Sequence, residues 1–428
     1  MSPRKAASGR KAPAPKRKGA KAGRRLSPEL NDVIRRGVVE IIPEDEFLEA
    51  LQSGRKLRLK LGLDPSKPDL HIGHAVLLRK LRILQEMGHQ VVLIIGDWTA
   101  QIGDPSGQSV TRPMLTAEEV KANAETYMRQ FFHVVDEKRT EVRWQSEWFG
   151  DFTLESVVRL TARFTVAQML QREDFRQRFD AHQPLGIHEL LYPLLQAYDS
   201  VAIEADVEFG GSDQRFNLLV GRELQQEMGQ RPQVCFIMRL LVGLDGVQKM
   251  AKSLGNTIDF EDPPNEQYGK VMSIPDSALL DYLELATDIP DEELAAIRRQ
   301  LEKRSVNPME IKKRLAREIV AQFHSETAVQ AAEQEFARTF QRGESPEEAL
   351  EVAVKSVGGK LAVDVLALLV DAGLTPSKAE ARRLVRQGAV EIDGDKISPQ
   401  QASEVVVQDG SIVRVGKHRF LRIVDADR

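Results

Sequence analysis

The sequence predicts an α/β protein in which a doubly wound parallel sheet is followed by a helical region and a small α+β unit. Strand-like and helix-like stretches alternate from about residue 30 to 260, the pattern is helical from about 275 to 342, and short strands return after Ala389. Alternating strands and helices are typical of a parallel sheet with helices on both faces.

The composition places the chain among globular proteins with several domains. Of 428 residues, 42% are hydrophobic and 29% charged, which is ordinary for that class. The single cysteine, Cys235, excludes an internal disulfide and a multi-cysteine zinc site. No apolar run approaches the ~18 residues of a membrane helix, and the N-terminus lacks the apolar core of a signal peptide. We therefore expect a cytoplasmic enzyme without membrane contact.

The charge is distributed unevenly. Residues 1–25 contain ten lysines and arginines and no acid, whereas the whole chain has a net charge of −4, so residues 26–428 total −14. A tail of this composition is predicted to be disordered. It suits either a solubilising extension or a nonspecific RNA-binding arm, and the sequence leaves both open.

Local signals place the first elements in order. Leucines alternate with basic residues over 57–61, which indicates a strand. A helix-like stretch beginning near His71 stops at Gly88, a favourable C-terminal cap, and the apolar run Val91 to Ile95 predicts the next strand. Thr116 and Glu119 form a capping box that predicts the start of another helix.

Prolines and glycines mark the boundaries of the remaining regions. Pro290, Pro308 and Gly343 divide the helical region, and two helix-like stretches flank residues 373–377. The dipeptide Asp393-Gly394 between short apolar runs is a hairpin signal.

The first motif that suggests chemistry spans residues 64–74, Asp-Pro-Ser-Lys-Pro-Asp-Leu-His-Ile-Gly-His. It follows a predicted strand and opens a predicted helix, so His71 and His74 lie on one helical face. Gly73 lets a flat base approach the backbone, and a helix N-terminus favours phosphate. A surface pair or a metal-binding pair is the alternative for two histidines alone; the Asp-Pro prelude and the strand-to-helix setting favour nucleotide binding.

The second motif is Lys249-Met250-Ala251-Lys252-Ser253, in a glycine-flanked segment. Two lysines three residues apart can stabilise charge that develops on a leaving pyrophosphate. A solvated basic loop is the alternative reading.

The third is a polar stripe on a leucine-rich helix. Tyr192, Gln196 and Asp199 share one narrow face of a stretch that four leucines predict to be buried. Buried polar groups need partners, so the stripe indicates either a polar ligand or an internal network. We favour the ligand because of the neighbouring motifs.

Together with Gly103-Asp104-Pro105-Ser106-Gly107 and Gly210-Gly211-Ser212-Asp213-Gln214, these motifs resemble, in order, the signatures of class I aminoacyl-tRNA synthetases, and among them the bacterial tyrosyl enzymes. The resemblance covers roughly residues 30 to 425. It implies a Rossmann-like catalytic domain that activates tyrosine with ATP and transfers it to the 3′ end of tRNA(Tyr). The alternatives are another class I enzyme, such as the tryptophanyl one, a non-catalytic RNA-binding relative, or a nucleotidyltransferase with a similar histidine motif.

The resemblance also assigns site residues. The expected catalytic residues are His71, His74, Lys249, Lys252 and Ser253; the ATP-binding ones are Gly62, Asp64, Gly73, Gly211, Asp213 and Lys252; the tyrosine-binding ones are Asp104, Tyr192, Gln196, Asp199 and Gln214. Tyr192 and Gln196 would contact the amino group, and Asp199 would accept from the phenol. Rejection of phenylalanine would then come from an unpaired buried carboxylate. Mg²⁺ would accompany ATP, and we expect no tightly bound metal or organic cofactor.

Three positions depart from the commonest pattern of the family. Lys60 stands where many members have a tyrosine, Gln108 where a lysine is frequent, and Ala251 where a small hydroxyl residue is usual. How the phenol is held is therefore open.

The C-terminal residues resemble a small RNA-binding module first named in a ribosomal protein. Ser377 is a predicted helix cap, and the basic residues that follow can track RNA phosphates; they are Lys378, Arg382, Arg383 and Arg386. A solvated helix face is the alternative.

We accordingly predict four regions. They are a disordered basic tail (1–29), the Rossmann-like catalytic domain (30–262), a helical tRNA-binding domain (263–350) and the small RNA-binding domain (358–428). The family resemblance implies a homodimer, with one tRNA contacting both subunits.

Overall fold

The computed structural model describes residues 34–67, 69–105, 115–341, 350–354, 361–375, 377–416 and 419–426. The basic tail, Gln108 and Gly343 lie outside these residues. The chain divides into two compact units: the first contains residues up to 66, 79–121 and 135–239, and the second contains 67–78, 122–134 and everything from 240 onward. Within the described ranges, no helix is both long and apolar enough to cross a membrane.

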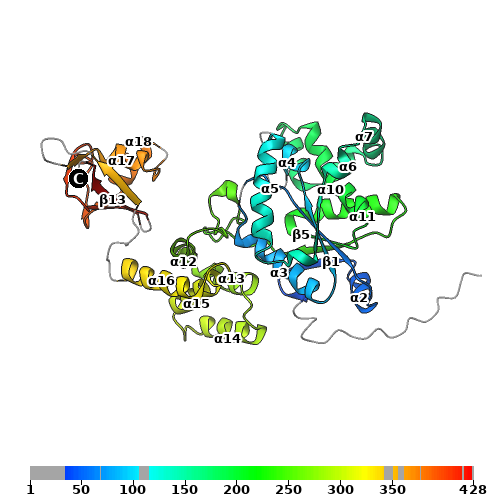
Figure 1. Cartoon of the computed structure of the whole chain (residues 1–428), viewed down its shortest axis with the longest axis horizontal. Helices are drawn as coiled ribbons and strands as arrows, with labels where there is room; N and C mark the ends of the chain where they lie inside the picture. The colour runs from blue at the N-terminus through cyan, green and yellow to red at the C-terminus, as the bar shows by residue number, and fades with distance from the viewer. Residues whose placement is uncertain are drawn as a thin grey trace, which may run out of the picture. The chain divides into compact units, whose positions relative to one another are not determined.

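A six-stranded sheet forms the centre of the first unit (Figure 1). Its spatial order is β1-β6-β5-β2-β3-β4. The strands are β1 (Val38–Ile42), β2 (Arg58–Leu63), β3 (Gln90–Ile95), β4 (Thr140–Trp144), β5 (Val207–Gly211) and β6 (Val234–Met238). All neighbours are parallel except β1, which runs antiparallel to β6. The predicted α/β class is confirmed, with an antiparallel edge strand that the sequence did not reveal; such edges are common on parallel sheets.

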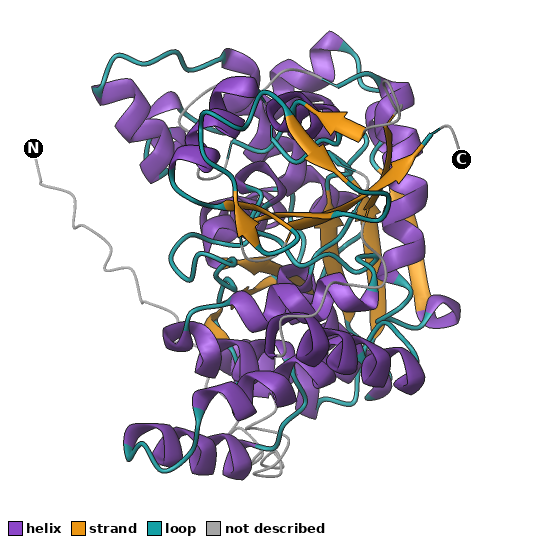
Figure 2. Ribbon diagram, turned by 90° about the vertical axis from the view of Figure 1, so that its left-hand side faces the viewer, coloured by secondary structure: helices purple, strands orange, loops and turns teal. Residues whose placement is uncertain are grey.

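Helices connect these strands (Figure 2). They are α2 (Glu44–Gln52), α3 (Ile72–Glu86), α4 (Thr99–Ile102), α5 (Ala117–Phe131), α6 (Ser146–Phe149), α7 (Leu154–Thr161), α8 (Val166–Met169), α9 (Glu173–Asp180), α10 (Ile187–Ala202) and α11 (Arg215–Glu227). The predicted stop is present, since Gly88 has a φ of +102° just after α3. The predicted capping box is present too: the Thr116 and Glu119 side chains each accept from the other's backbone N–H. The whole polar stripe lies on α10, which packs against α11.

The helical pattern expected after residue 275 is present in the second unit. The helices are α12 (Pro264–Ser273), α13 (Leu279–Ala286), α14 (Asp291–Glu302), α15 (Pro308–Val320) and α16 (Glu326–Phe336). Both prolines act as predicted: Pro290 precedes α14 and Pro308 is the first residue of α15, where its missing N–H costs nothing.

Residues from 350 onward form their own small core. The elements are β7 (Leu350–Val354), β8 (Leu361–Val363), α17 (Val365–Asp371), α18 (Lys378–Arg386), β9 (Val390–Ile392), β10 (Asp395–Lys396), β11 (Val405–Val407), β12 (Ile412–Val415) and β13 (Arg419–Asp425). Asp393 and Gly394 both have positive φ and join β9 to β10 in the predicted hairpin. Ser377 caps α18, since its hydroxyl accepts from the Glu380 N–H.

Candidate functional site

The histidine turn (residues 70–74) is paired through its backbone with the segment that follows the lysine loop (residues 249–253). The Ile72 N–H donates to the Ile258 carbonyl at 2.9 Å, and the Phe260 N–H donates to the Leu70 carbonyl at 3.1 Å. His71 and Asp259 form a bridge between these two bonds. Two motifs about 180 residues apart thus come together within the second unit.

Both imidazoles are neutral near pH 7. Burial lowers the pKa of His74 to about 4, and the nearby Lys252 ammonium adds to the effect. Burial first, and then the positive charges around it, lower the pKa of His71 well below its ordinary value. The His71 backbone N–H donates to Nδ1 of His74 at 3.2 Å. The proton of His74 is therefore on Nε2, which leaves a neutral N–H donor for an anion.

Position 73 requires glycine for a second reason, in addition to the expected approach of a nucleotide to the backbone. A Cβ at this position would lie 2.9 Å from Nδ1 of His71. Only glycine leaves the His71 ring where it is, with its centroid 4.0 Å from that of the tilted His74 ring.

Asn256 stabilises the lysine loop through two hydrogen bonds. This residue was not predicted from the sequence. Its Oδ1 accepts from the Ala251 N–H at 2.9 Å, and its Nδ2 donates to the Lys249 carbonyl at 3.1 Å. Gly243 makes room for this side chain, because a Cβ there would lie 2.1 Å from Nδ2 of Asn256.

Two carboxylates hold the Lys252 ammonium. Its Nζ lies 2.5 Å from Asp259 and 3.4 Å from Asp69. Neither aspartate was predicted; Asp69 lies in the histidine motif, but its spacing gave no hint of this pair. Ser253 is exposed.

The five predicted tyrosine-binding residues all lie in the first unit, and Tyr192 contacts the predicted ATP-binding residue Asp64. The Tyr192 hydroxyl, on α10, donates to Asp64 Oδ2 at 2.7 Å, and Asp64 Oδ1 accepts from Thr99 at 2.7 Å. A Cβ on Gly96 would lie 2.1 Å from Asp64 Oδ1, so glycine is required beside it. Burial and the adjacent carboxylates raise the pKa of Tyr192 well above its ordinary value, which keeps the phenol protonated.

Asp104 and Gln214 join this group. The Gln214 side-chain Nε2 donates to Asp104 Oδ2 at 2.7 Å, and the Arg172 guanidinium lies 3.7 Å from Asp104 Oδ1. Gln196 is half-buried on the same face of α10 as Tyr192. These contacts assemble acceptors of the kind that an ammonium group needs.

Asp199 is 2% exposed, and each of its oxygens already has a donor. Gln145 Nε2 donates to Oδ2 at 2.8 Å and Trp148 Nε1 donates to Oδ1 at 3.1 Å. The expectation of an otherwise unpaired carboxylate is therefore wrong, because residues 145 and 148 supply partners that no motif indicated. Each oxygen retains a lone pair for a phenol. Burial raises the pKa of Asp199 to about 7, and the positive charge of Lys60 opposes that rise.

The remaining predicted nucleotide-binding residues lie at strand ends. Gly62 is near the carboxyl end of β2, and Gly211 ends β5, its parallel neighbour. Open α/β sheets bind ligands at this edge. Asp213 lies in the short 3-10 turn Ser212–Gln214, which precedes α11 and follows the end of β5.

The basic residues of α18 fall into two groups. Lys378 pairs with Asp364 at 3.2 Å and Arg383 pairs with Glu380 at 2.5 Å. Arg382 and Arg386 are exposed, and neither has an ion-pair partner in the part of the chain that the structure describes. The second group therefore offers the stronger charge to a polyanion.

Comparison with known proteins agrees with these features. The family model "tRNA synthetases class I (W and Y)" matches residues 52–341, and the model "Tyrosine--tRNA ligase SYY-like C-terminal domain" matches residues 351–423. A tyrosine-tRNA ligase of Dehalococcoides mccartyi (strain CBDB1) is 57% identical over 396 residues, which cover 92% of this chain and 98% of the relative. One from Moorella thermoacetica is 52% identical over 395 residues, covering 91% and 94%.

Solved structures support the fold. A C-terminally truncated Aspergillus nidulans mitochondrial tyrosyl-tRNA synthetase has a TM-score of 0.61 at 20% identity, covering 74% of this chain and 95% of that one. The Archaeoglobus fulgidus tyrosyl-tRNA synthetase complexed with L-tyrosine has a TM-score of 0.57 at 23% identity, covering 71% and 98%. From the family model and the closely similar relatives, we conclude that the chain belongs to the class I tRNA synthetases and, within them, to the tyrosine-tRNA ligases.

Proposed function

We propose that the chain charges tRNA(Tyr) in two steps. The carboxylate of tyrosine attacks the α-phosphorus of ATP, which forms tyrosyl-adenylate and releases pyrophosphate. A ribose hydroxyl at the 3′ end of the tRNA then attacks the tyrosyl carbonyl and releases AMP. The observation that supports this most strongly is the backbone pairing of the histidine turn with the segment after the lysine loop, since it gathers two neutral imidazoles and an ammonium.

The first step needs positioning and charge stabilisation rather than a general base. A free carboxylate is already ionised at pH 7, so no proton has to be removed from the nucleophile. Neutral His74 donates from Nε2, and the two lysines carry positive charge toward the developing pyrophosphate. Phosphate oxygens would replace Asp69 and Asp259 as partners of Lys252. Mg²⁺ enters with ATP as part of the substrate.

Recognition of tyrosine uses both ends of the amino acid. Tyr192, Gln196 and Asp64 offer acceptors to the ammonium, and Asp104 adds negative charge. Asp199 accepts from the phenol hydroxyl through a lone pair that Gln145 and Trp148 leave over. Phenylalanine would displace water from that lone pair without replacing its hydrogen bond, which costs binding energy.

The exposed apolar side chains of the first unit support a homodimer. Leu154 is 79% exposed and Ile187 is 80% exposed, and Val158 and Phe179 are also exposed. Large apolar side chains gathered in one segment of the sequence, on α7, α9 and the start of α10, are typical of a surface that another protein covers. We propose a second copy of this chain as that partner.

The tRNA would be held by the helices after residue 263 and by the exposed arginines of α18. Because tRNA and ATP are cytoplasmic, we place the reaction in the cytoplasm.

ATP-pyrophosphate exchange, measured with each amino acid in turn, tests the function. We expect exchange with tyrosine and none above background with tryptophan or phenylalanine. Exchange with tryptophan would favour the tryptophanyl alternative, and no exchange with any amino acid would favour a non-catalytic relative.

A further inference from the structure

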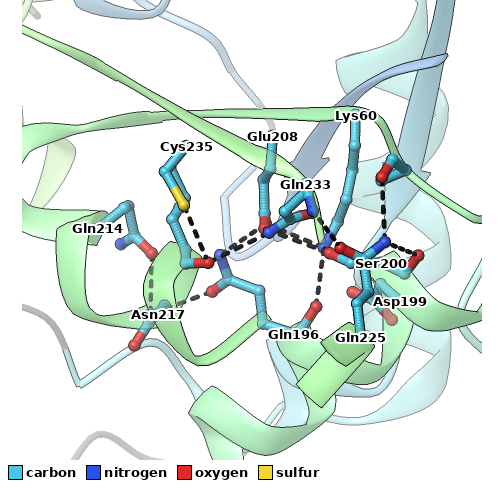
Figure 3. A network of polar contacts seen from close by, with 12 residues as sticks. Lys60, Gln196, Asp199, Ser200, Glu208, Gln214, Asn217, Gln225, Gln233 and Cys235 are labelled. Carbon is cyan, nitrogen blue, oxygen red and sulfur yellow. Dashed lines mark hydrogen bonds and ion pairs between the residues drawn. The ribbon is translucent and has the colours of Figure 1, made fainter. Parts of the chain in front are cut away.

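A buried ion pair lies between two neighbouring strands in the first unit. Lys60 on β2 and Glu208 on β5 are register partners, and they are 0% and 1% exposed. Their Nζ and Oε1 atoms are 2.9 Å apart. Lys60 Nζ also donates to the backbone carbonyl of Gln196 and to the Ser200 hydroxyl, both at 2.7 Å, so its three N–H donors are used. Lysine at this position therefore points into the protein's own network (Figure 3).

Glu208 fixes the orientation of the Gln196 side-chain amide. A carboxylate can only accept, so the amide must present its NH₂ group. The Gln196 Nε2 donates to Glu208 Oε1 at 3.1 Å. The other Glu208 oxygen accepts from Gln233 at 2.5 Å and from Ser200 at 3.2 Å, which leaves Glu208 fully partnered.

Asn217 couples the orientation of the Gln196 amide to that of the Gln214 amide. Its Nδ2 donates to Gln196 Oε1 at 3.0 Å and to Gln214 Oε1 at 2.9 Å. Figure 3 shows Asn217 between the two glutamines. The Asn217 Oδ1 accepts from Arg172 at 3.2 Å, which fixes its own orientation. Both glutamine oxygens are thereby oriented as acceptors.

The helix next to this network is shaped to fit it. A Cβ on Gly221 of α11 would lie 2.7 Å from Gln233 Nε2 and 3.2 Å from Glu208 Oε2. A glycine inside a helix is less favourable than an alanine. At this position the missing side chain leaves room for the polar groups of Gln233 and Glu208.

We propose that the Lys60–Glu208 pair and Asn217 are positioning residues that set the polarity of the Gln196 and Gln214 amides, so that their oxygens accept from the α-ammonium group of tyrosine. The inference rests on the proposed function, in which Gln196 binds that ammonium. It gives Lys60 a role that does not involve the phenol.

The test compares two ligands that differ only in the ammonium. L-Tyrosine and 3-(4-hydroxyphenyl)propionate are titrated calorimetrically into the full chain and into the double variant Lys60→Met/Glu208→Gln, which removes both charges together. A glutamine at 208 can donate as well as accept, so the Gln196 amide is free to turn over. We expect the preference for tyrosine over the amine-free acid to fall at least about tenfold, since hydrogen bonds to charged groups are the stronger ones.

Another buried ion pair in the first unit provides a matched control. Arg178 and Glu189 form another buried pair, 2.7 Å apart, with Glu189 on α10. Arg178→Met/Glu189→Gln should leave the ligand preference unchanged, even where it lowers stability. A purely structural role for Lys60–Glu208 would weaken both ligands equally and overturn the inference.

If the double variant does not fold, Asn217→Asp provides an independent test. It is isosteric and turns the shared donor into an acceptor facing two glutamine oxygens. We expect the same loss of preference, and an unchanged preference would overturn the proposal. If the parent chain itself binds tyrosine no better than the amine-free acid, the proposed role of Gln196 is wrong, and this inference falls with it.

Discussion

Asp199→Asn should become more stable relative to the parent protein as the pH rises. Asp199 is 2% exposed, and burial raises its pKa from 3.8 to about 7. Because the folded-state pKa lies above the unfolded value, the stability that the neutral acid contributes is fully present below pH 3.8 and is lost as pH rises through 7. An asparagine does not ionise, so the variant avoids that loss.

The size of the effect follows from the two pKa values. The difference between 7 and 3.8 corresponds to about 4 kcal/mol at pH 8, at 1.36 kcal/mol per unit. At pH 5, which lies 1.2 units above the unfolded pKa of 3.8, only the unfolded carboxyl is ionised, and this corresponds to roughly 1.6 kcal/mol. The stability of the variant relative to the parent should therefore grow by about 2 to 3 kcal/mol between pH 5 and pH 8.

Urea unfolding at both pH values measures this directly. The three tryptophans, Trp98, Trp144 and Trp148, all lie in the first unit, so their fluorescence follows the unfolding of the part that contains Asp199. The new amide NH₂ must face Gln145 or Trp148, which adds a cost that does not change with pH. The pH dependence is thus the decisive quantity. An equal difference between variant and parent at both pH values would refute the assignment of a raised pKa.

Four further results are expected. Lys252→Ala should lower the rate of pyrophosphate exchange about 10²- to 10³-fold with little change in tyrosine affinity; equal losses in both would contradict its role. A chain ending at residue 350 should keep exchange and lose aminoacylation, and normal charging by it would disprove the tRNA-binding assignment. Reversing the charges of Arg382 and Arg386 should weaken tRNA binding about tenfold and reduce its salt dependence, and unchanged binding would favour a merely solvated helix face. Ile187→Glu should shift the protein to monomers in sedimentation velocity, whereas an unaltered dimer would move the interface elsewhere.

Signals that act over a few residues could be read from the sequence. The helix stop at Gly88, the Thr116 capping box, the Asp393-Gly394 hairpin and the cap at Ser377 are all present, because each is decided by backbone geometry within one turn. The α/β class could be predicted for the same reason, since the alternation of elements needs no knowledge of their packing.

Interactions set by packing could not be read in this way. Alternating leucines and basic residues predicted a strand, but the pattern did not indicate that Lys60 is fully buried, as it is because β2 is a central strand covered on both sides. Its partner Glu208 becomes visible only once the register of β2 and β5 is known. Likewise, Gln145 and Trp148 reach Asp199 across more than 50 residues, and no spacing rule relates them.

In the proposed mechanism, the tyrosine carboxylate itself attacks the α-phosphorus while imidazole and ammonium groups stabilise the departing pyrophosphate. Tyrosine labelled with ¹⁸O in both carboxylate oxygens tests it in one complete reaction with ATP and tRNA. We expect AMP that carries one ¹⁸O, because the carboxylate oxygen bonded to phosphorus leaves with AMP when the ribose hydroxyl attacks the carbonyl. Unlabelled AMP, or ¹⁸O in pyrophosphate, would contradict it.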